Sequence, residues 1–404
     1  MRNKLTIFTG VSLLAIFFNP ISIKAQGTTD SPASMFGLGE LVNNETGRYS
    51  GMGGVGIALR SDNFLNTNNP AALTAVDTCK FVWEMGLHGK YDKYDSGSQN
   101  STAFEGNISN IALGFSLRKV SFALGLAPYS SMGYAITETK SVEGTANSTT
   151  SSLFEGDGGT SKIYFSVAYK LFKNLSVGAT MNYLLGHTVE TEAMDATTVQ
   201  TTSRKNAFFA DFGAQYTMLI DKKQAFTFGL VYGYKQIIQQ HNKLVVADSN
   251  SGDGSTQNGV HKKEQIIPQY FGGGIAWTKE RLTLTADYRR IQWSPMPADV
   301  VTFVNQDKVN VGGDYLFGNL YKEPAHIMAG LGYENSYMMK NGCNPKTYSV
   351  SAGVGLPVLN KNLLSLGVKY SIQPTSPQKF QRTNSFCVFL NISFHEKSMR
   401  YKIE

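Results

Sequence analysis

Three groups of residues in this chain have types and spacings that could support chemistry, and the first is rich in glycine. Gly51, Gly53 and Gly56 fit the spacing of a dinucleotide-binding loop. That motif works only at a strand-to-helix turn, with an acidic residue about 20 positions further on. The surrounding sequence has no alternating strand and helix pattern. Because glycine also permits positive φ and close backbone packing, we expect Gly51, Gly53, Gly54 and Gly56 to serve packing instead.

The second group is basic. Lys235, Arg289 and Lys369 fall on the polar side of stretches that alternate between apolar and polar residues. Cations on the wall of a partly dry cavity would give a carboxylate charge-assisted hydrogen bonds, which makes these three candidate ligand-binding residues. They could equally be solvated or paired with nearby carboxylates, for which Asp211, Asp287 and Glu334 are candidates.

The third group is apolar and lies in segments that otherwise look like loops. It is a candidate entry patch for an apolar ligand, with packing within the loops as the equal alternative. Its main members are Tyr129, Met132, Tyr134 and Phe154.

Signals for catalysis and metal binding are absent from the sequence. The histidines do not fall at a recognised spacing from a serine nucleophile or from carboxylates. Three cysteines, Cys79, Cys343 and Cys387, allow at most one disulfide and have no metal-ligand spacing. The sequence leaves open whether Cys79 and Cys343 pair. We therefore expect no enzyme activity, no cofactor and no metal.

Composition restricts the class of protein. The 404 residues include 40 Gly, 20 Tyr and 24 Phe, and only 17% are charged, whereas about 25% is usual for soluble domains. The mean hydropathy of −0.19, and the absence of any apolar run of about 20 residues after the N-terminus, exclude a bundle of membrane helices. The net charge of +7 comes from scattered basic residues, so we expect no nucleic-acid partner.

Residues 1–25 are typical of a signal peptide. Arg2 and Lys4 precede an apolar stretch from Leu5 to Phe18, and Ala25 supplies a small residue at the expected cleavage point. The alternative is an uncleaved anchor, but the apolar stretch is shorter than a bilayer requires. We expect an exported protein.

From about Phe81 onward the chain repeats a period of two. In residues 163–170 the apolar set Ile163, Phe165, Val167 and Tyr169 alternates with smaller or more polar residues, a pattern that predicts strands with one apolar face. The opposite faces of these stretches are mostly Gly, Ser, Thr and Asn, which suits a polar lumen better than a filled core. Backbone groups in lipid must all be paired, so such strands have to close into a ring.

The connections alternate in length, as in outer-membrane barrels, which have short periplasmic turns and longer outer loops. Six short links, the first at 118–119, take turns with seven long polar stretches, including 130–160 and 187–203. The pattern predicts a transmembrane antiparallel β-barrel of about 14 strands over residues 81–394. Residues 395–404 would form a periplasmic tail, and both termini would be periplasmic.

Residues 26–80 do not alternate. They include Asn69-Pro70-Ala71, which reads either as an Asn-Pro turn or as part of a structured segment. The segment is too short for a core of its own, so we expect it to form a plug, or hatch, inside the lumen.

Several of these pieces, in this order, resemble the FadL-type outer-membrane transporters of hydrophobic compounds, of the kind found in Bacteroidetes. The pieces are the glycine run 51–56, Asn69-Pro70-Ala71, Ala127-Pro128-Tyr129 closing the third strand, and 267–294 with Ile267-Pro268 and Trp293-Ser294. The resemblance implies a fourteen-stranded barrel with Asn69, Pro70 and Ala71 in a gating hatch. It also implies capture of an apolar ligand near the outer surface and its sideways release through a defect in the wall.

The first expectation for function is therefore passive uptake of hydrophobic small molecules, such as long-chain fatty acids, by a monomer in outer-membrane lipid. The alternative is a FadL-like barrel that binds a protein partner, as in members of this family that assist type IX secretion. Co-purification of a ligand or of a protein would separate the two.

Overall fold

The computed structural model describes residues 31–42, 48–78, 80–95, 100–141, 149–248, 254–298, 300–318, 324–339, 342–358, 362–374 and 382–397. The expected signal peptide, Cys79 and residues 398–404 lie outside the described residues. Short helices occur only near the start of the described chain: η1 (Pro32–Met35), α2 (Arg48–Gly51) and η2 (Pro70–Ala75). No helix among the described residues is long and apolar enough to cross a bilayer.

Strands account for most of the fold. Those that form the wall are β2 (Lys80–Asp95), β3 (Asn100–Leu117), β4 (Val120–Ser141), β5 (Thr149–Lys170), β6 (Leu175–Met194), β7 (Thr197–Asp221), β8 (Gln224–Gly233), β9 (Gln236–Asp248), β12 (Gln269–Lys279), β13 (Leu282–Gln292), β15 (Gln306–Phe317), β16 (Ala325–Asn335), β18 (Lys346–Val358), β19 (Asn362–Gln373) and β20 (Arg382–Lys397). Shorter strands are β1 (Glu40–Leu41), β10 (Gly254–Asn258), β11 (Gln265–Ile267), β14 (Thr302–Phe303) and β17 (Met338–Met339).

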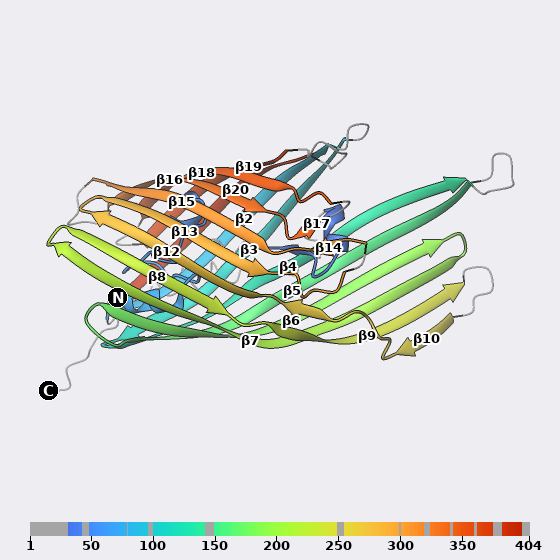
Figure 1. Ribbon diagram of the computed structural model, residues 1–404, viewed down its shortest axis with the longest axis horizontal. Coiled ribbons are helices and arrows are strands. Elements are labelled where there is room, and N and C mark those ends of the chain that lie inside the picture. The colour runs from blue at the N-terminus through green and yellow to red at the C-terminus, as the bar shows by residue number, and fades with distance from the viewer. Residues whose placement is uncertain are drawn as a thin grey trace, which may run out of the picture.

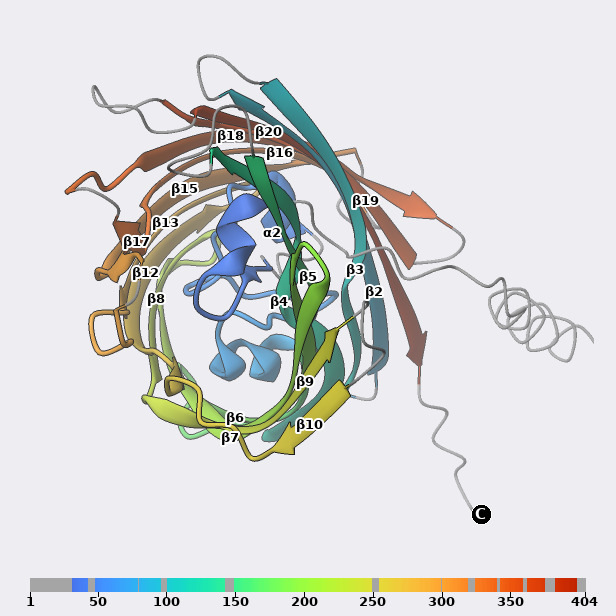
Figure 2. The same ribbon diagram turned by 90° about the vertical axis from the view of Figure 1, so that its right-hand side faces the viewer.

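The wall strands close into one antiparallel ring. Each pairs with its neighbour along the chain, and the last strand, β20, pairs with the first, β2, from Lys80↔Lys397 to Asp95↔Arg382. Strand β9 continues β8 after a short break, so the ring has fourteen members (Figures 1 and 2). The expected fourteen-stranded antiparallel barrel is confirmed. Closure leaves no sheet edge at the level of the bilayer except at the seam described below.

The alternation of the sequence places large apolar side chains on the outside of the ring. Ile163, Phe165 and Tyr169 on β5 are each more than 40% exposed. Met181 and Tyr183 on β6 repeat the pattern. An outward apolar band with a polar inner face is the arrangement that a lipid bilayer requires of a barrel.

The two ends of the barrel differ. At one end, the turn end, successive strands are joined by short links such as residues 118–119 and 222–223. At the other, the hairpin end, β4, β5, β6 and β7 run for 22, 22, 20 and 25 residues, about twice the length that spans a bilayer. Figure 1 shows these strands projecting beyond the rest of the wall.

The projecting strands differ from the sequence prediction. Residues 130–160 and 187–203 read as long polar loops, yet most of each range is strand, joined by a turn at 195–196 in β6–β7. Their Thr, Ser and Val residues are compatible with a sheet that water covers on both faces, and polar composition alone does not distinguish such a sheet from a loop. At the C-terminal end, β20 likewise continues to Lys397, three residues beyond the expected end of the barrel.

One seam in the ring is only partly closed. Strand β3 pairs with β2 from Asn100 to Phe115, but with β4 only from Ile111↔Leu126 to Leu117↔Val120. Beyond Leu126, β4 has a bulge between Pro128 and Ser130, where proline removes a donor and the bulge bends the strand. No described strand takes the place of β4 beside residues 100–110 of β3. The sequence prediction that the third strand closes at Tyr129 is wrong: the strand bends there and continues.

Candidate functional site

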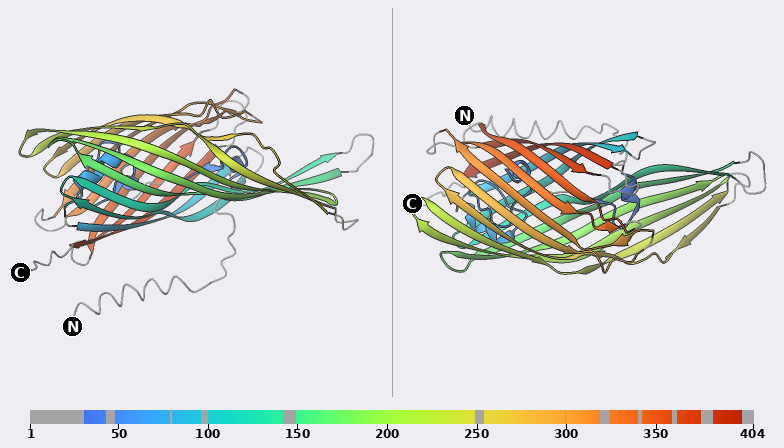
Figure 3. Two further views of the ribbon diagram at one scale, coloured as in Figure 1. Left: turned by 90° about the horizontal axis from the view of Figure 1, so that it is seen from below. Right: turned by 45° about the horizontal axis from the view of Figure 1, so that its top comes forward.

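The described part of the N-terminal region lies inside the ring in two parts (Figures 2 and 3). We call residues 48–76 the inner segment and residues 31–42 the strap. The inner segment contacts wall residues close to the turn end, such as Glu84 and Gly229, whereas the strap contacts β4 at Ser130 and Ser131. Residues on both parts line a shared cavity, described below.

Glycines in the wall make room for the backbone of the inner segment. A Cβ on Gly229 would overlap with the carbonyl oxygen of Ile57, and a Cβ on Gly330 would overlap with the backbone between Met52 and Gly53. Gly178 likewise faces the backbone between Pro70 and Ala71, and Gly213 makes room for the side chain of Asn69. The glycines of the wall and the fold of the inner segment are therefore complementary surfaces.

Apolar side chains of the inner segment pack against small residues of the wall. Leu65, Leu73 and Val76 form one buried cluster with wall residues that include Ala112 and Ala123. A second cluster joins Tyr49, Met52, Val55, Ala58 and Leu59 to Ala276 and Met328. The inner segment thus takes its core from the barrel, which a stretch of this length cannot supply itself.

Buried carboxylates of the wall hold the inner segment by its backbone. Asp287 Oδ2 accepts hydrogen bonds from the backbone nitrogens of Gly56 at 2.6 Å and Ile57 at 2.8 Å. Glu84 Oε1 accepts one from Leu65 at 2.8 Å. Leaving a buried backbone donor without its partner costs about 1–3 kcal/mol, so these two side chains anchor the inner segment to the wall.

Asn69 is the structural centre of the Asn69-Pro70-Ala71 sequence. Its Oδ1 accepts a hydrogen bond from the backbone nitrogen of Ala71 and caps η2. Its Nδ2 donates to the carbonyl oxygen of Ile57 at 2.8 Å and contacts those of Ala214 and Leu230. One fully buried amide thus connects the inner segment to two strands of the wall.

The glycine run fits the interpretation of packing and positive φ. Gly53 and Gly54 have φ of 76° and 81°, which non-glycine residues rarely adopt. Gly51 packs against Gly353, and its carbonyl oxygen accepts a hydrogen bond from Ser351 Oγ. No strand-to-helix turn of the dinucleotide-binding type is present at these residues, which lie in α2 and the turns after it.

The strap covers part of the open seam. Its strand β1 pairs with β4 through Glu40↔Ser131 and Leu41↔Ser130, at the level where β4 has lost β3. The Glu40 carboxylate also forms an ion pair with Lys90 on β2, and Lys90 is held by Asp92 as well, at 2.8 Å. The strap is therefore bonded to both sides of the gap.

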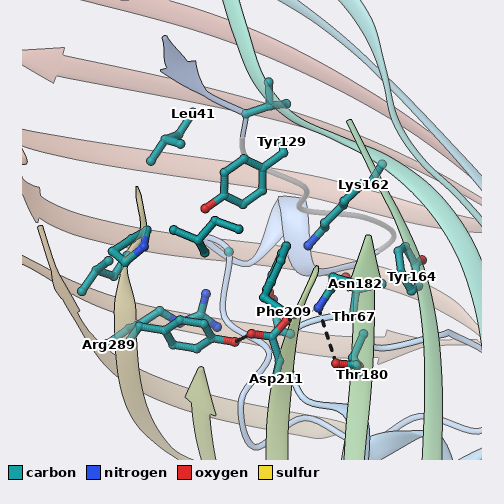
Figure 4. A pocket seen from close by; sticks show the side chains of 18 of the residues that line it. Leu41, Thr67, Tyr129, Lys162, Tyr164, Thr180, Asn182, Phe209, Asp211 and Arg289 are labelled. Carbon is teal, nitrogen blue, oxygen red and sulfur yellow. Dashed lines mark hydrogen bonds between the residues drawn. The ribbon is translucent and has the colours of Figure 1, made fainter. Parts of the chain in front are cut away.

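A cavity of about 240 Å³, which we call the chamber, lies between strap and inner segment. Leu41 and Val42 line it from the strap, and Gly54 and Ile57 line it from the inner segment. Aromatic side chains contribute much of its wall (Figure 4): Tyr129, Tyr164, Phe209, Tyr270 and Trp293.

The charged groups of the chamber differ in whether they have hydrogen-bond partners within the described protein. Asp211 accepts hydrogen bonds from Tyr270 Oη and Asn182 Nδ2, both at 2.8 Å. The guanidinium of Arg289 lies over the ring of Tyr270, 5.2 Å from its centroid. Among the residues that the structure describes, none accepts a hydrogen bond from Arg289 or Lys162. The chamber therefore presents cationic donors whose acceptor is not a described protein atom.

The chamber also reaches the seam. Asn110 on β3 and Ala127 on β4 both line it, and each is the next residue beyond the last pair of the two strands, Ile111↔Leu126. The opening of the wall and the cavity thus meet at the same point.

A second cavity, of about 330 Å³, lies nearer the hairpin end, and we call it the mouth cavity. Its apolar lining includes Phe36, Met132, Met296 and Phe303, and its polar lining includes Lys205. Lys205 is 3% exposed, and its Nζ has no hydrogen-bond partner in the described part of the chain. The mouth cavity therefore has a mixed lining, in which these apolar side chains stand beside the charged residues Glu190, Lys205, Lys262, Lys263 and Glu264.

The seven predicted ligand-binding residues lie at several different places in the structure. Arg289 and Tyr129 line the chamber, and Met132 lines the mouth cavity. Tyr134 is buried against Gly156 of β5. The other three line neither cavity: Lys235 is exposed at the break between β8 and β9, Lys369 is half-buried on β19, and Phe154 is half-buried on β5.

Lys162, Lys205 and the position of Asp211 in the chamber were not predicted from the sequence. Lys162 and Lys205 occupy inward positions of alternating strands, which was an available signal for both. Both lay in or beside stretches read as loops, so their strands were not extended far enough to show it. Among the described residues, no group of three or more His, Cys, Asp or Glu is placed to hold a metal ion.

A closed fourteen-stranded barrel with an apolar outer band defines an outer-membrane β-barrel protein. The chain belongs to the BamG family, whose model matches residues 7–402. No curated protein matches it.

Solved structures share the fold at low sequence identity. A Pseudomonas aeruginosa FadL homologue is 14% identical with a TM-score of 0.60, covering 90% of this chain and 100% of that chain. The Ralstonia pickettii toluene transporter TbuX is 13% identical with a TM-score of 0.59, covering 88% and 99%. The monoaromatic hydrocarbon channel CymD is 15% identical with a TM-score of 0.58, covering 91% and 99%. The FadL-type fold expected from the sequence is confirmed.

Proposed function

We propose that this protein is a passive outer-membrane channel for hydrophobic small molecules, with the hairpin end outside and both termini in the periplasm. The mouth cavity would receive the molecule, the chamber would hold it, and the seam between β3 and β4 would release it sideways into the bilayer. The observation that carries the proposal is that Asn110 and Ala127 line the chamber where their strands part. The names of the similar structures, a monoaromatic hydrocarbon channel and a toluene transporter, support it.

In this proposal the inner segment is the plug and the strap is the movable part of the gate. The inner segment is fixed by buried carboxylates and by glycine-to-backbone packing. The strap, in contrast, is held by a two-residue strand against β4, by single hydrogen bonds such as that from Val42 N to the carbonyl oxygen of Tyr129, and by the ion pair of Glu40 with Lys90. Displacing it would uncover the seam and remove Leu41 from the chamber. A lateral route lets an apolar solute avoid the polar turn end.

The test is a disulfide between strap and wall. Leu41 and Ser130 are directly opposed, at a spacing that suits a disulfide in an antiparallel pair. In a background without the three native cysteines, L41C/S130C should stop uptake of radiolabelled toluene into proteoliposomes when oxidised and restore it when reduced. The matched control is T278C/T283C, a directly opposed pair at the turn end. Equal uptake in the oxidised and reduced L41C/S130C protein would refute release through the seam.

The projecting strands favour a second candidate function, the binding of a protein partner. The far ends of β4 and β5, residues 136–140 and 149–154, carry no exposed large hydrophobic residue, so the tip of this hairpin lies outside the apolar band. Such a surface is not needed to conduct a small molecule. Replacing residues 136–154 with a tight turn should leave toluene uptake unchanged. If the barrel has an adaptor role, the same truncation should release a protein that co-purifies with the native chain in stoichiometric amount.

A further inference from the structure

We infer that the chamber is built for a single-ring aromatic carboxylate, rather than for a neutral aromatic compound or a long-chain fatty acid. The inference rests on the proposed function for the role of the chamber, and adds the chemical class of its ligand. It is carried by three properties of the chamber: its volume, its aromatic wall and its unsatisfied donors.

The volume of the chamber limits the size of the ligand that it can hold. A cavity of about 150 Å³ in a protein interior binds benzene, which corresponds to roughly 25 Å³ per non-hydrogen atom. By the same measure, the chamber of about 240 Å³ holds roughly ten such atoms. Benzoate and its close relatives are of this size, whereas palmitate is roughly twice as large.

The wall favours a flat ring. Tyr129 and Phe209 meet edge to face with their centroids 6.2 Å apart, and Trp293 closes the same side, stacked on Tyr337 at 4.7 Å. Aromatic rings gain from offset or edge contacts with one another beyond the burial of their area. A planar ligand among these side chains would make such contacts, which an aliphatic chain of equal size would not.

The hydrogen-bond donors that line the chamber favour an anionic ligand. Lys162 and Arg289 line the chamber from opposite parts of the ring, β5 and β13, and Figure 4 shows the Lys162 ammonium directed into the cavity. Trp293 is 1% exposed and its Nε1 has no partner in the described chain, and the same holds for the buried Nδ2 of Asn110. A carboxylate accepts several such bonds at once, and those from cations are the stronger kind.

Two carboxylates of the lining, Asp211 and Asp287, attract Lys162 and Arg289 electrostatically, but neither accepts a hydrogen bond from these cations. Both oxygens of Asp211 are engaged by Tyr270 and Asn182, and Asp287 Oδ2 is engaged by Gly56 and Ile57. Lys308, the third cation of the lining, pairs with Glu334 at 2.8 Å. Two buried acceptors, Asn182 Oδ1 and Asp287 Oδ1, have no partner in the described residues, so a hydroxyl on the ring would also be accommodated.

Calorimetric titration of the purified full-length mature barrel in detergent tests the inference, with benzoate, toluene and palmitate as probes. Benzoate should bind more tightly than either of the others. Lys162→Met and Arg289→Met should each weaken the binding of benzoate by about tenfold or more. Each should change the affinity for toluene by less than about twofold. Lys162→Arg, which keeps the charge, should stay within a few-fold of the native affinity.

Lys235→Met is the matched control, because Lys235 is an exposed cation that lines neither cavity. Tighter binding of palmitate than of benzoate would overturn the inference. So would equal benzoate affinity in the native, Lys162→Met and Arg289→Met proteins, each shown to be folded by its thermal unfolding.

Failure of the inference and failure of the proposed function are distinguishable. Toluene uptake that the strap disulfide blocks, with no benzoate binding, refutes the inference alone. Charge-dependent benzoate binding without any uptake into proteoliposomes refutes the channel and leaves the inference standing.

Discussion

Asp287 Oδ2 lies 2.6 Å from the backbone nitrogen of Gly56, although the two residues are 231 positions apart in the chain. The carboxylate belongs to the wall and the amide to the inner segment, so this bond joins the two parts of the molecule. It also places a negative charge where the segment presents two free amides in succession. The wall therefore determines the position of the segment by hydrogen bonds as well as by shape.

Asp287→Ala removes both acceptor bonds and leaves two buried amides without a partner. We expect the inner segment to be destabilised locally by about 2–4 kcal/mol, while the barrel itself stays folded. Hydrogen exchange at Gly56 and Ile57 should accelerate by at least about tenfold. Asp157→Ala, at an exposed position on β5, is the control, and equal exchange in both variants would contradict an anchoring role for Asp287.

Gly229→Ala tests the fit between wall and inner segment. The added methyl group would overlap with the carbonyl oxygen of Ile57, and backbone atoms cannot move aside as a flexible side chain can. We expect overpacking to cost about 1–3 kcal/mol and to make the barrel leaky to polar solutes in liposome swelling. Gly273→Ala on β12 has its nearest neighbour, Leu230, at 3.7 Å and should change nothing. A tight Gly229→Ala barrel would show that the inner segment does not seal the lumen.

Asn69 has two functions that two substitutions can separate. Asn69→Asp keeps the oxygen that caps η2 but places a second oxygen against the carbonyl of Ile57. Asn69→Ala loses both the cap and the donor. Capping alone contributes about 1 kcal/mol, so if the cap dominates, Asn69→Asp should resemble the native protein. We expect instead that both variants leak in conductance measurements, since the buried donor connects the segment to the wall.

Glu40→Gln tests the ion pair that holds the strap. The substitution keeps the shape of the side chain and leaves the pair between Lys90 and Asp92 intact, but removes the charge that attracts Glu40 to Lys90. We expect the strap to leave the seam more often. Asn110→Cys, at the point where the strands part, should then react several times faster with a lipid-soluble maleimide. The comparison variant is Glu138→Gln, near the exposed end of β4. If both variants react at the rate of the native background, the strap is not the cover of the seam.

The architecture of the barrel was predictable because its physical cause is local. A residue such as Phe165 faces lipid and its neighbour Ser166 faces the lumen for the same reason, the period of two in an extended strand. That period is visible without any knowledge of the partner strand. The short links at 118–119 and 279–281 were predictable for the same reason, since each interrupts the period and carries charged residues.

The ends of the strands were less predictable. Residues 130–141 form strand although their composition reads as loop, because β4 is hydrogen-bonded to β5 all the way to Ser141↔Thr149. Such pairing depends on which segment lies alongside, and that information is not contained in either segment alone. The same limit applies to Lys235, which lies outside both strands because the wall breaks between Gly233 and Gln236, so the period of two does not extend to it.

The closed barrel in a membrane follows from the residue pattern alone, since a repeated apolar face of this length has no other way to satisfy its backbone in lipid. The candidate site, in contrast, depends on how the whole chain folds. The chamber brings together Leu41, Lys162 and Arg289, which come from three distant parts of the chain. The seam depends on how far β3 and β4 stay paired after a bulge. Distances between residues of distant strands follow from the register and closure of the whole ring, and no local pattern of residues encodes them.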